Sequence, residues 1–360
     1  MTDAELTALE ADHAPDDVPP CPVCREARTL RLNTGKTFEQ VKRGRYRLVM
    51  DAAGEHPALT PPVVPAVVSG QASLYQADCI AWLRARAPNS VHAVVTDPPY
   101  SVVEYSDKEL EKLRNGRGGV WRIPPSFDGH QRSPVPRFTT LTPSDLEAIA
   151  DFFRVWAMAL TPVLVPGAHV FIASNPLLSY LVSYAVASAG LERRGEVARL
   201  VMTMRGGDRP KNAHDEFADV SVMPRSMWEP WLLFRKPMEG RAQDNLRKWR
   251  TGVLRRVSAE QPFGDVIKSS PTRNAERALA PHPSLKPQAF VRCLVRASLP
   301  LGDGIVLDPF AGSGSTLAAA EAVGYKSVGV ELDAEYVRMA ATAIPRLAAI
   351  KIAQEAQEDL

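Results

Sequence analysis

The chain has 360 residues, of which 45% are hydrophobic and 23% are charged, as in a soluble globular protein with one large domain or two. Its formal net charge is only +2, so a nucleic-acid site would need local clusters of basic residues. No apolar run is long enough to cross a membrane, and the acidic N-terminus lacks a signal-peptide core, which together predict a cytoplasmic protein without a membrane partner.

The first 72 residues are predicted to be an N-terminal extension that is partly disordered. Residues 1–20 are acidic and aperiodic, residues 36–50 are basic and favour a short strand or arm, and residues 57–68 form a proline-rich linker. Cys21 and Cys24 have the spacing of half a zinc site, but no second ligand pair lies nearby. We therefore expect two free thiols and no metal.

From Ser73 onward, short apolar strands alternate with helical segments. The helix expected at 143–160 has Ser144 as its candidate N-cap and Glu147 three residues later. Because the strands are continuous apolar runs, the pattern predicts a parallel sheet with helices on both faces, a doubly wound α/β fold. We expect strands at 73–78, 91–96, 167–174, 196–204, 230–235, 304–310 and 327–333, and further helices at 79–87, 176–189, 315–324 and from 334 onward.

Four of the expected strands end at acidic residues, namely Asp78, Asp97, Asp308 and Glu331. In doubly wound sheets, ligands bind beyond the carboxyl ends of the strands. Asp308 leads into the turn DPFAGSGST at 308–316, which has neither the third glycine of a dinucleotide motif nor the lysine of a phosphate-binding loop. An acid at the start of this turn disfavours a phosphate ligand and suits a ligand with an ammonium group.

The same acids indicate the rest of the ligand. Glu331 stands where an acid accepts hydrogen bonds from ribose hydroxyls, and Asp78 is expected near an adenine amino group. Gly312 and Gly314 allow the backbone to approach the ligand closely. A nucleoside with a cationic amino-acid tail fits these features, so the sequence predicts S-adenosylmethionine as cofactor.

The stretch Asp97-Pro98-Pro99-Tyr100 suits methylation of an exocyclic base amine. Such an amine is a poor nucleophile because its lone pair is delocalised into the ring. Asp97 and the Pro98 carbonyl can accept its two N–H groups, and Tyr100 can stack on a base flipped out of the duplex. Prolines are tolerated here because the strand is ending and their missing N–H is not needed.

These motifs resemble those of the DNA amino-methyltransferases. Asp97–Tyr100 resembles their catalytic motif, and 308–316 resembles their cofactor loop. The order of the two, together with His282–Pro287 and the Asp78-Cys79 pair, resembles the permuted beta class, which implies a circularly permuted Rossmann-like sheet. The resemblance implies cofactor contacts from Asp78, Cys79, Lys286, Asp308, Phe310, Gly312, Ser313, Gly314, Thr316 and Glu331.

The resemblance also divides the chain. Residues 73–237 would be the catalytic half, with a mobile loop at 101–140, and residues 282–360 the cofactor-binding half. Between them, 238–281 is polar, basic and short, and is the expected target-recognition insertion, small and irregular. Basic residues that could contact DNA phosphates are Arg117 and Arg122 in the loop and Arg247, Lys248, Arg250 and Arg255 in the insertion.

The expected function is therefore site-specific methylation of adenine N6 in double-stranded DNA. The alternatives are methylation of cytosine N4, of RNA or of protein glutamine, and a catalytically idle nucleic-acid-binding module. The resemblance implies a bacterial or phage-encoded protein, with or without a cognate restriction enzyme, and a monomer or homodimer. The recognition sequence is left open.

Overall fold

A computed structural model describes residues 36–42, 45–50, 64–99, 141–201, 209–210, 212–282 and 284–352. It divides into two compact units, Met1–Leu59 and Thr60–Leu360. The first contains an antiparallel hairpin of β1 (Lys36–Lys42) and β2 (Arg45–Met50), in the segment where a strand or arm is expected. Cys21 and Cys24 lie outside the described residues.

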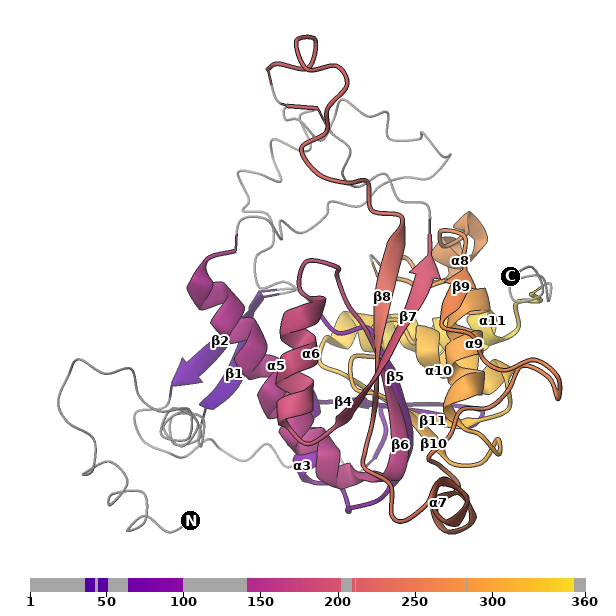
Figure 1. The fold of residues 1–360 in the computed structure, drawn as a ribbon. Helices are drawn as coiled ribbons and strands as arrows, with labels where there is room; N and C mark the ends of the chain where they lie inside the picture. The colour runs from indigo at the N-terminus through magenta and orange to yellow at the C-terminus, as the bar shows by residue number, and fades with distance from the viewer. Residues whose placement is uncertain are drawn as a thin grey trace, which may run out of the picture. The chain divides into compact units, whose positions relative to one another are not determined.

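The second unit is built on one nine-stranded sheet (Figure 1). In sheet order, the strands are β3 (Val67–Ser69), β4 (Ala72–Gln76), β11 (Lys326–Glu331), β10 (Ile305–Asp308), β5 (Val91–Thr96), β6 (Leu164–Ala173), β8 (Trp228–Arg235), β7 (Glu192–Leu200) and β9 (Val266–Lys268). The five strands from β4 to β6 run parallel. Strand β8 is antiparallel to both of its neighbours, and β9 is parallel to β7.

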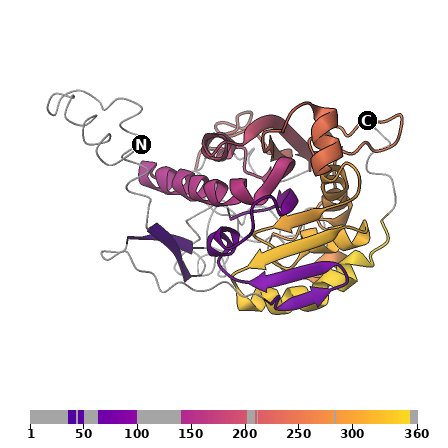
Figure 2. The ribbon, with the colours of Figure 1, turned by 90° about the horizontal axis from the view of Figure 1, so that it is seen from below.

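Helices cover both faces of this sheet, as the alternating pattern predicts (Figures 1 and 2). On one face lie α3 (Cys79–Arg84), α5 (Pro143–Val163) and α6 (Ser179–Ser188), and on the other lie α9 (Gln288–Ser298), α10 (Ser315–Ala322) and α11 (Ala334–Ala348). The central strands β5, β6 and β10 are buried at most positions because both faces are covered, which explains their continuous apolar sequences.

Two boundaries differ from the sequence expectations. The sheet begins at β3, so the boundary expected between residues 72 and 73 falls inside the β3–β4 hairpin. Helix α5 is capped by Thr142 rather than Ser144: the Thr142 Oγ1 accepts from the Asp145 amide at 3.3 Å, and the Asp145 carboxylate accepts from the Thr142 amide at 2.8 Å. Pro143 then occupies the first helical position, where its missing N–H costs nothing.

The segment 238–281 has more regular structure than its sequence indicates. It contains α7 (Ala242–Trp249), β9 and α8 (Asn274–Leu279). Strand β9 pairs with β7 and completes the nine-stranded sheet, so this segment is continuous with the sheet rather than an irregular appendage. Its role in target recognition stays a prediction.

Candidate active site

The four acids at strand ends lie along one edge of the sheet. Strands β4, β11, β10 and β5 are consecutive and parallel, so their carboxyl ends gather on the same side. Asp308 and Glu331 are the last residues of β10 and β11, Asp97 follows β5 directly, and Asp78 comes two residues after β4. The shared edge expected from the sequence is confirmed.

The glycine turn after β10 requires glycine at two positions. Gly312 and Gly314 have φ angles of +51° and +85°, which favour glycine. A Cβ atom at Gly312 would lie 3.0 Å from the His282 ring, and one at Gly314 would lie 2.5 Å from Ile344. The turn therefore forms a narrow backbone cradle, closed on one side by His282.

Asp308 and Glu331 hold this cradle in place. Asp308 Oδ1 accepts from Thr96 Oγ1 at 2.7 Å and from the Phe310 amide at 3.1 Å. Glu331 accepts from the Gly312 amide at 2.8 Å through Oε2 and from the Asp333 amide at 2.8 Å through Oε1. Since a carboxylate oxygen has two lone pairs, these bonds leave capacity for a ligand.

Burial raises the pKa of both carboxyls. The pKa of Asp308 rises to about 6, because burial outweighs the hydrogen bonds from Thr96, Thr316 and the Phe310 amide. The pKa of Glu331 is also raised by burial, and the Asp333 and Gly312 amides oppose the shift. Asp308 is therefore a carboxyl that a nearby cation would stabilise in its charged form.

The other expected cofactor residues surround the same edge, with Lys286 as the exception. Asp78 caps α3 by accepting from the Ala81 amide at 2.8 Å, and burial, Asp78 and Glu331 raise the pKa of the neighbouring Cys79 thiol. Ser313 in the turn and Thr316 at the start of α10 are buried, and Phe310 packs against α5. The carboxylates and the glycine cradle fit a ligand that carries an ammonium group and hydroxyls.

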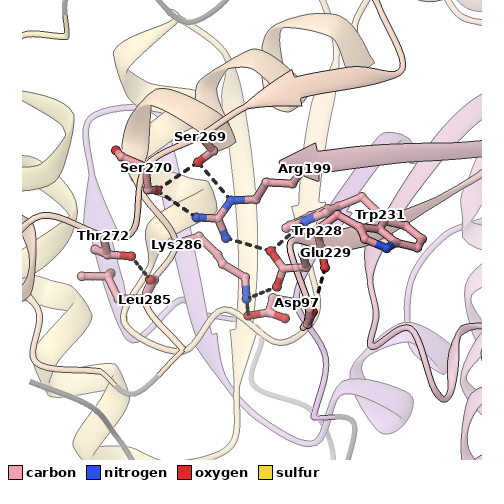
Figure 3. Close-up of polar contacts among 11 residues, drawn as sticks. Asp97, Arg199, Trp228, Glu229, Trp231, Ser269, Ser270, Thr272, Leu285 and Lys286 are labelled. Atoms are coloured by element: carbon pink, nitrogen blue, oxygen red, sulfur yellow. Dashed lines mark hydrogen bonds and ion pairs between the residues drawn. The ribbon is translucent and has the colours of Figure 1, made fainter. Parts of the chain in front are cut away.

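Lys286 lies against Asp97 rather than in the glycine cradle (Figure 3). Its Nζ atom is 2.9 Å from Asp97 Oδ2 and 2.9 Å from Glu229 Oε1. Glu229 in turn pairs with Arg199, whose Nη1 atom is 2.7 Å from Oε2. Two acids and two bases thus form a continuous row that starts at Asp97.

The charges in this row stabilise one another. Burial alone would lower the pKa of Lys286, but Asp97 and Glu229 raise it above its ordinary value. Burial would raise the pKa of Glu229, but Lys286 and Arg199 lower it. Sequence reasoning missed Glu229 and Arg199, and the only signal was a single acid in the apolar strand WEPWLLFR.

His282 is a further residue outside the expected set of site residues, although it belongs to the His282–Pro287 motif. Its ring packs edge-on against Tyr336 with the ring centroids 4.3 Å apart, and its Nδ1 atom accepts from the Ser284 amide at 3.1 Å. These contacts fix the ring beside Gly312. The His282–Pro287 motif was the only feature of the sequence that indicated a position of His282 close to the cradle.

Of the expected catalytic motif, the structure describes Asp97, Pro98 and Pro99. Pro98 is buried, and the side chain of Asp97 is 16% exposed, so the end of β5 is held by the protein interior. Tyr100 lies outside the described residues, as do Arg117 and Arg122. Their roles stay predictions.

The four basic residues expected to contact DNA from the 238–281 segment lie at the opposite edge of the sheet from Asp97. The neighbouring Asn245 side chain donates to the Pro166 carbonyl at 3.0 Å, near the start of β6. In Figure 1, α7 accordingly lies at one end of the sheet strands and β9 lies near the other end. All four already have protein partners: Arg247 pairs with Asp244, Lys248 with Glu239, Arg250 with Asp303, and Arg255 with the Tyr325 hydroxyl.

The described residues offer neither a membrane span nor a metal cluster. No helix in the described part of the chain is both long and apolar enough to span a membrane. The same residues contain no cluster of three or more His, Cys, Asp or Glu side chains that could hold a metal ion.

Comparison with known proteins yields DNA methyltransferases. The chain is 22% identical over 267 residues to the Type II methyltransferase M2.DpnII of Streptococcus pneumoniae, covering 74% of this chain and 87% of that protein. It is 35% identical over 128 residues to the DNA adenine methyltransferase YhdJ of Escherichia coli K12, covering 32% of this chain and 43% of that protein.

One solved DNA methyltransferase shares the fold of this chain. The PvuII DNA methyltransferase, described as cytosine-N4-specific, covers 81% of this chain and 92% of its own with a TM-score of 0.52 at 16% identity. A putative DNA modification methylase from Thermus thermophilus, solved with S-adenosyl-L-methionine, covers 77% and 94% with a TM-score of 0.47 at 21% identity. The profile of the N6/N4 DNA methylase family matches residues 91–342, more than half of the chain, and the protein therefore belongs to this family of DNA methylases.

Proposed function

We propose that this DNA methylase transfers the methyl group of S-adenosylmethionine to the N6 amine of adenine in double-stranded DNA. The observation that carries the proposal is the hydrogen bond of 2.7 Å from Thr96 at the end of β5 to Asp308 at the end of β10. It holds the catalytic acid and the glycine cradle on neighbouring strands. A methyl donor in the cradle and an amine at Asp97 would therefore be adjacent.

The cradle side would hold the cofactor through the strand-end acids. Asp308 and the turn around Gly312 suit the amino-acid end, Glu331 suits the ribose hydroxyls, and Asp78 suits the adenine amino group. When bound, the cofactor supplies a methyl group activated by its sulfonium charge. The Asp308 carboxyl favours a bound ammonium because that charge compensates the burial that raises its pKa.

On the acceptor side, Asp97 and the Pro98 carbonyl would accept the two N–H groups of the target amine. These bonds favour a more tetrahedral nitrogen, whose lone pair is available for in-line attack. The Lys286 ammonium, 2.9 Å from Asp97, favours the charged carboxylate that such a bond requires. The extra proton of the methylated amine leaves during or after transfer, so Asp97 need not be a strong base.

Adenine is favoured over cytosine by two observations. The residue at the catalytic position is Asp97, and the Asp-Pro-Pro-Tyr form is more common in the adenine-N6 enzymes that the motif resembles. The relative with 35% identity is named a DNA adenine methyltransferase. The likeness to the cytosine-N4-specific PvuII enzyme, at 16% identity, concerns the fold alone.

The test is methyl transfer from labelled S-adenosylmethionine to unmethylated duplex DNA, followed by mass spectrometry of the nucleosides. We expect N6-methyladenine from the wild type and none from Asp97→Asn, which keeps the size of the side chain. Asp303→Asn, a substitution of an exposed acid at the opposite edge, should retain activity. Formation of N4-methylcytosine would overturn adenine as the target base. Methyl transfer retained in both variants would overturn the role of Asp97.

A further inference from the structure

The row of charges behind Asp97 extends far beyond the catalytic motif (Figure 3). Its members come from four separate segments: Asp97 follows β5, Lys286 precedes α9, Glu229 lies on β8 and Arg199 lies on β7. Their side chains are only 16%, 14%, 19% and 7% exposed, respectively. Buried charges are retained only when they are paired, and here every charge has a partner of opposite sign.

Arg199 anchors the outer end of the row. Its Nε atom donates to Ser269 Oγ at 3.0 Å and its Nη2 atom to the Ser270 carbonyl at 3.2 Å, while its guanidinium lies over the Phe290 ring. Because Arg199 is held on three sides, the Glu229 carboxylate that it binds has a fixed position. One Glu229 oxygen is bound by Arg199 and the other by Lys286.

A second ion pair on the same strands shows what a purely structural pair looks like. Residues 199 and 229 are register partners on β7 and β8, and so are Glu192 and Arg235. Glu192 and Arg235 form an ion pair of 2.6 Å at the other end of these strands, about 23 Å along β7 from Arg199. That pair joins two strands, whereas Glu229 also binds the lysine that contacts Asp97.

The lysine needs this second partner because its side chain is long and flexible. With Glu229 present, the ammonium is held between two carboxylates at 2.9 Å each. With Glu229 neutral, Asp97 would be its only anionic partner among these contacts. The ammonium would then draw more strongly on the Asp97 carboxylate and would be free to change its position.

We propose that Glu229 is a positioning residue for methyl transfer, which fixes the Lys286 ammonium against Asp97 and so orients the carboxylate that receives the target amine. This inference rests on the proposed function. Glu229 is linked to Asp97 through the Lys286 ammonium that both carboxylates contact. Its effect should therefore be seen in the rate of the methyl-transfer step and in its pH dependence, and not in cofactor affinity.

The direction of the pH effect follows from the same contacts. Glu229 is one of the two groups that raise the pKa of Lys286. Without its charge the pKa of Lys286 falls, so the ammonium loses its proton at a lower pH. The alkaline decline in methylation should begin at a lower pH in a variant that lacks this charge.

The experiment compares Glu229→Gln with the matched control Glu192→Gln in the full chain. Single-turnover methylation of duplex DNA should fall about tenfold to a hundredfold in Glu229→Gln, the range expected for a catalytic group displaced by up to about 1 Å. The dissociation constant for S-adenosylmethionine should stay within twofold of wild type. Glu192→Gln should match the wild type in rate and pH profile, with thermal melting as the check on folding.

Equal rates and pH profiles in the two variants would overturn the inference while leaving the proposed function intact. Absence of adenine methylation in the wild type itself would instead refute the proposed function. If Glu229→Gln does not fold, Glu229→Asp serves in its place, because it keeps the charge and shortens the reach. It should lower the rate and keep the wild-type pH profile, and a wild-type rate would overturn the proposal.

Discussion

Replacing Lys286 with methionine should destabilise the protein by an amount that depends on pH. Methionine has a similar length and no charge, so Asp97 and Glu229 would lose the cation that both contact at 2.9 Å. One such pair corresponds to about 6 kcal/mol of gross Coulomb energy at an effective dielectric constant of about 20. Desolvation offsets most of this, and removing one partner of a buried pair typically costs about 3–5 kcal/mol.

The lower end of that range, about 3 kcal/mol, is expected for Lys286→Met. The three side chains keep 14–19% exposure, so water screens the remaining charges in part. Arg199 also still binds Glu229. Denaturant unfolding of wild type and variant, monitored by circular dichroism, measures the difference. Lys248→Met is the matched control: Lys248 is also paired with a glutamate, but its side chain is 59% exposed, so the loss should be much smaller.

The pH dependence distinguishes lost charge from lost packing. In the wild type, Lys286 helps to hold the pKa of Glu229 below its ordinary value. The charged Glu229 therefore stabilises the folded state at pH values above its ordinary pKa, and this contribution is lost as the pH falls through the lowered pKa. In the variant, burial acts with less opposition, and the carboxyls take up protons at higher pH. The gap between the two proteins should therefore narrow on acidification from neutral pH. A gap that stays constant with pH would refute this electrostatic reasoning.

Two further predictions concern the cofactor side. Gly314→Ala places a methyl group 2.5 Å from Ile344 at a φ of +85°, so calorimetry should show at least a tenfold loss of S-adenosylmethionine affinity; Gly190→Ala, also at positive φ but with no atom within 4 Å, should bind normally. Thr96→Val removes a hydroxyl that lowers the pKa of Asp308, which is about 6. The loss of cofactor affinity on acidification, expected near pH 6 in the wild type, should shift to higher pH in this variant, and an unchanged profile would contradict the role of Asp308.

The sequence predicted well that the strand-end acids share one edge of the sheet, because that arrangement depends on local patterns. Each acid follows its own apolar strand, and the turn around Gly312 lies within one strand–turn–helix unit. Parallel strands then bring their carboxyl ends together whatever their order. The shared location of the four acids could therefore be predicted without knowing which strands are neighbours; they are Asp78, Asp97, Asp308 and Glu331.

The row behind Asp97 was not predictable in this way. Arg199 and Glu229 meet because β8 is antiparallel between β6 and β7, and this pairing is not encoded in either strand alone. Lys286 was assigned to the cofactor from a motif, while its contact with Asp97 depends on where the chain enters α9. Such long-range contacts are decided by the packing of the whole sheet.

Local charge does not show where a basic segment lies in the fold. The basic run around Arg247 suggests a surface that contacts phosphates, and the structure does expose it, with the Arg247 side chain 76% exposed. Its location is set by a neighbour without charge: Asn245 is fully buried and donates to the Pro166 and Thr251 carbonyls. This buried amide fixes α7 at the amino ends of the strands, far from Asp97.

The end of β5 explains how the two halves of the site can be close and still distinct. Thr96 and Asp97 are consecutive, so their side chains leave an extended backbone in opposite directions. Thr96 donates to Asp308 at the end of β10, and Asp97 pairs with Lys286 and the row behind it. Pro98, which is buried, follows at once and ends the pairing. A shift of one residue in this strand would exchange the two directions, so the register of β5 decides which side chain reaches Asp308 and which reaches Lys286.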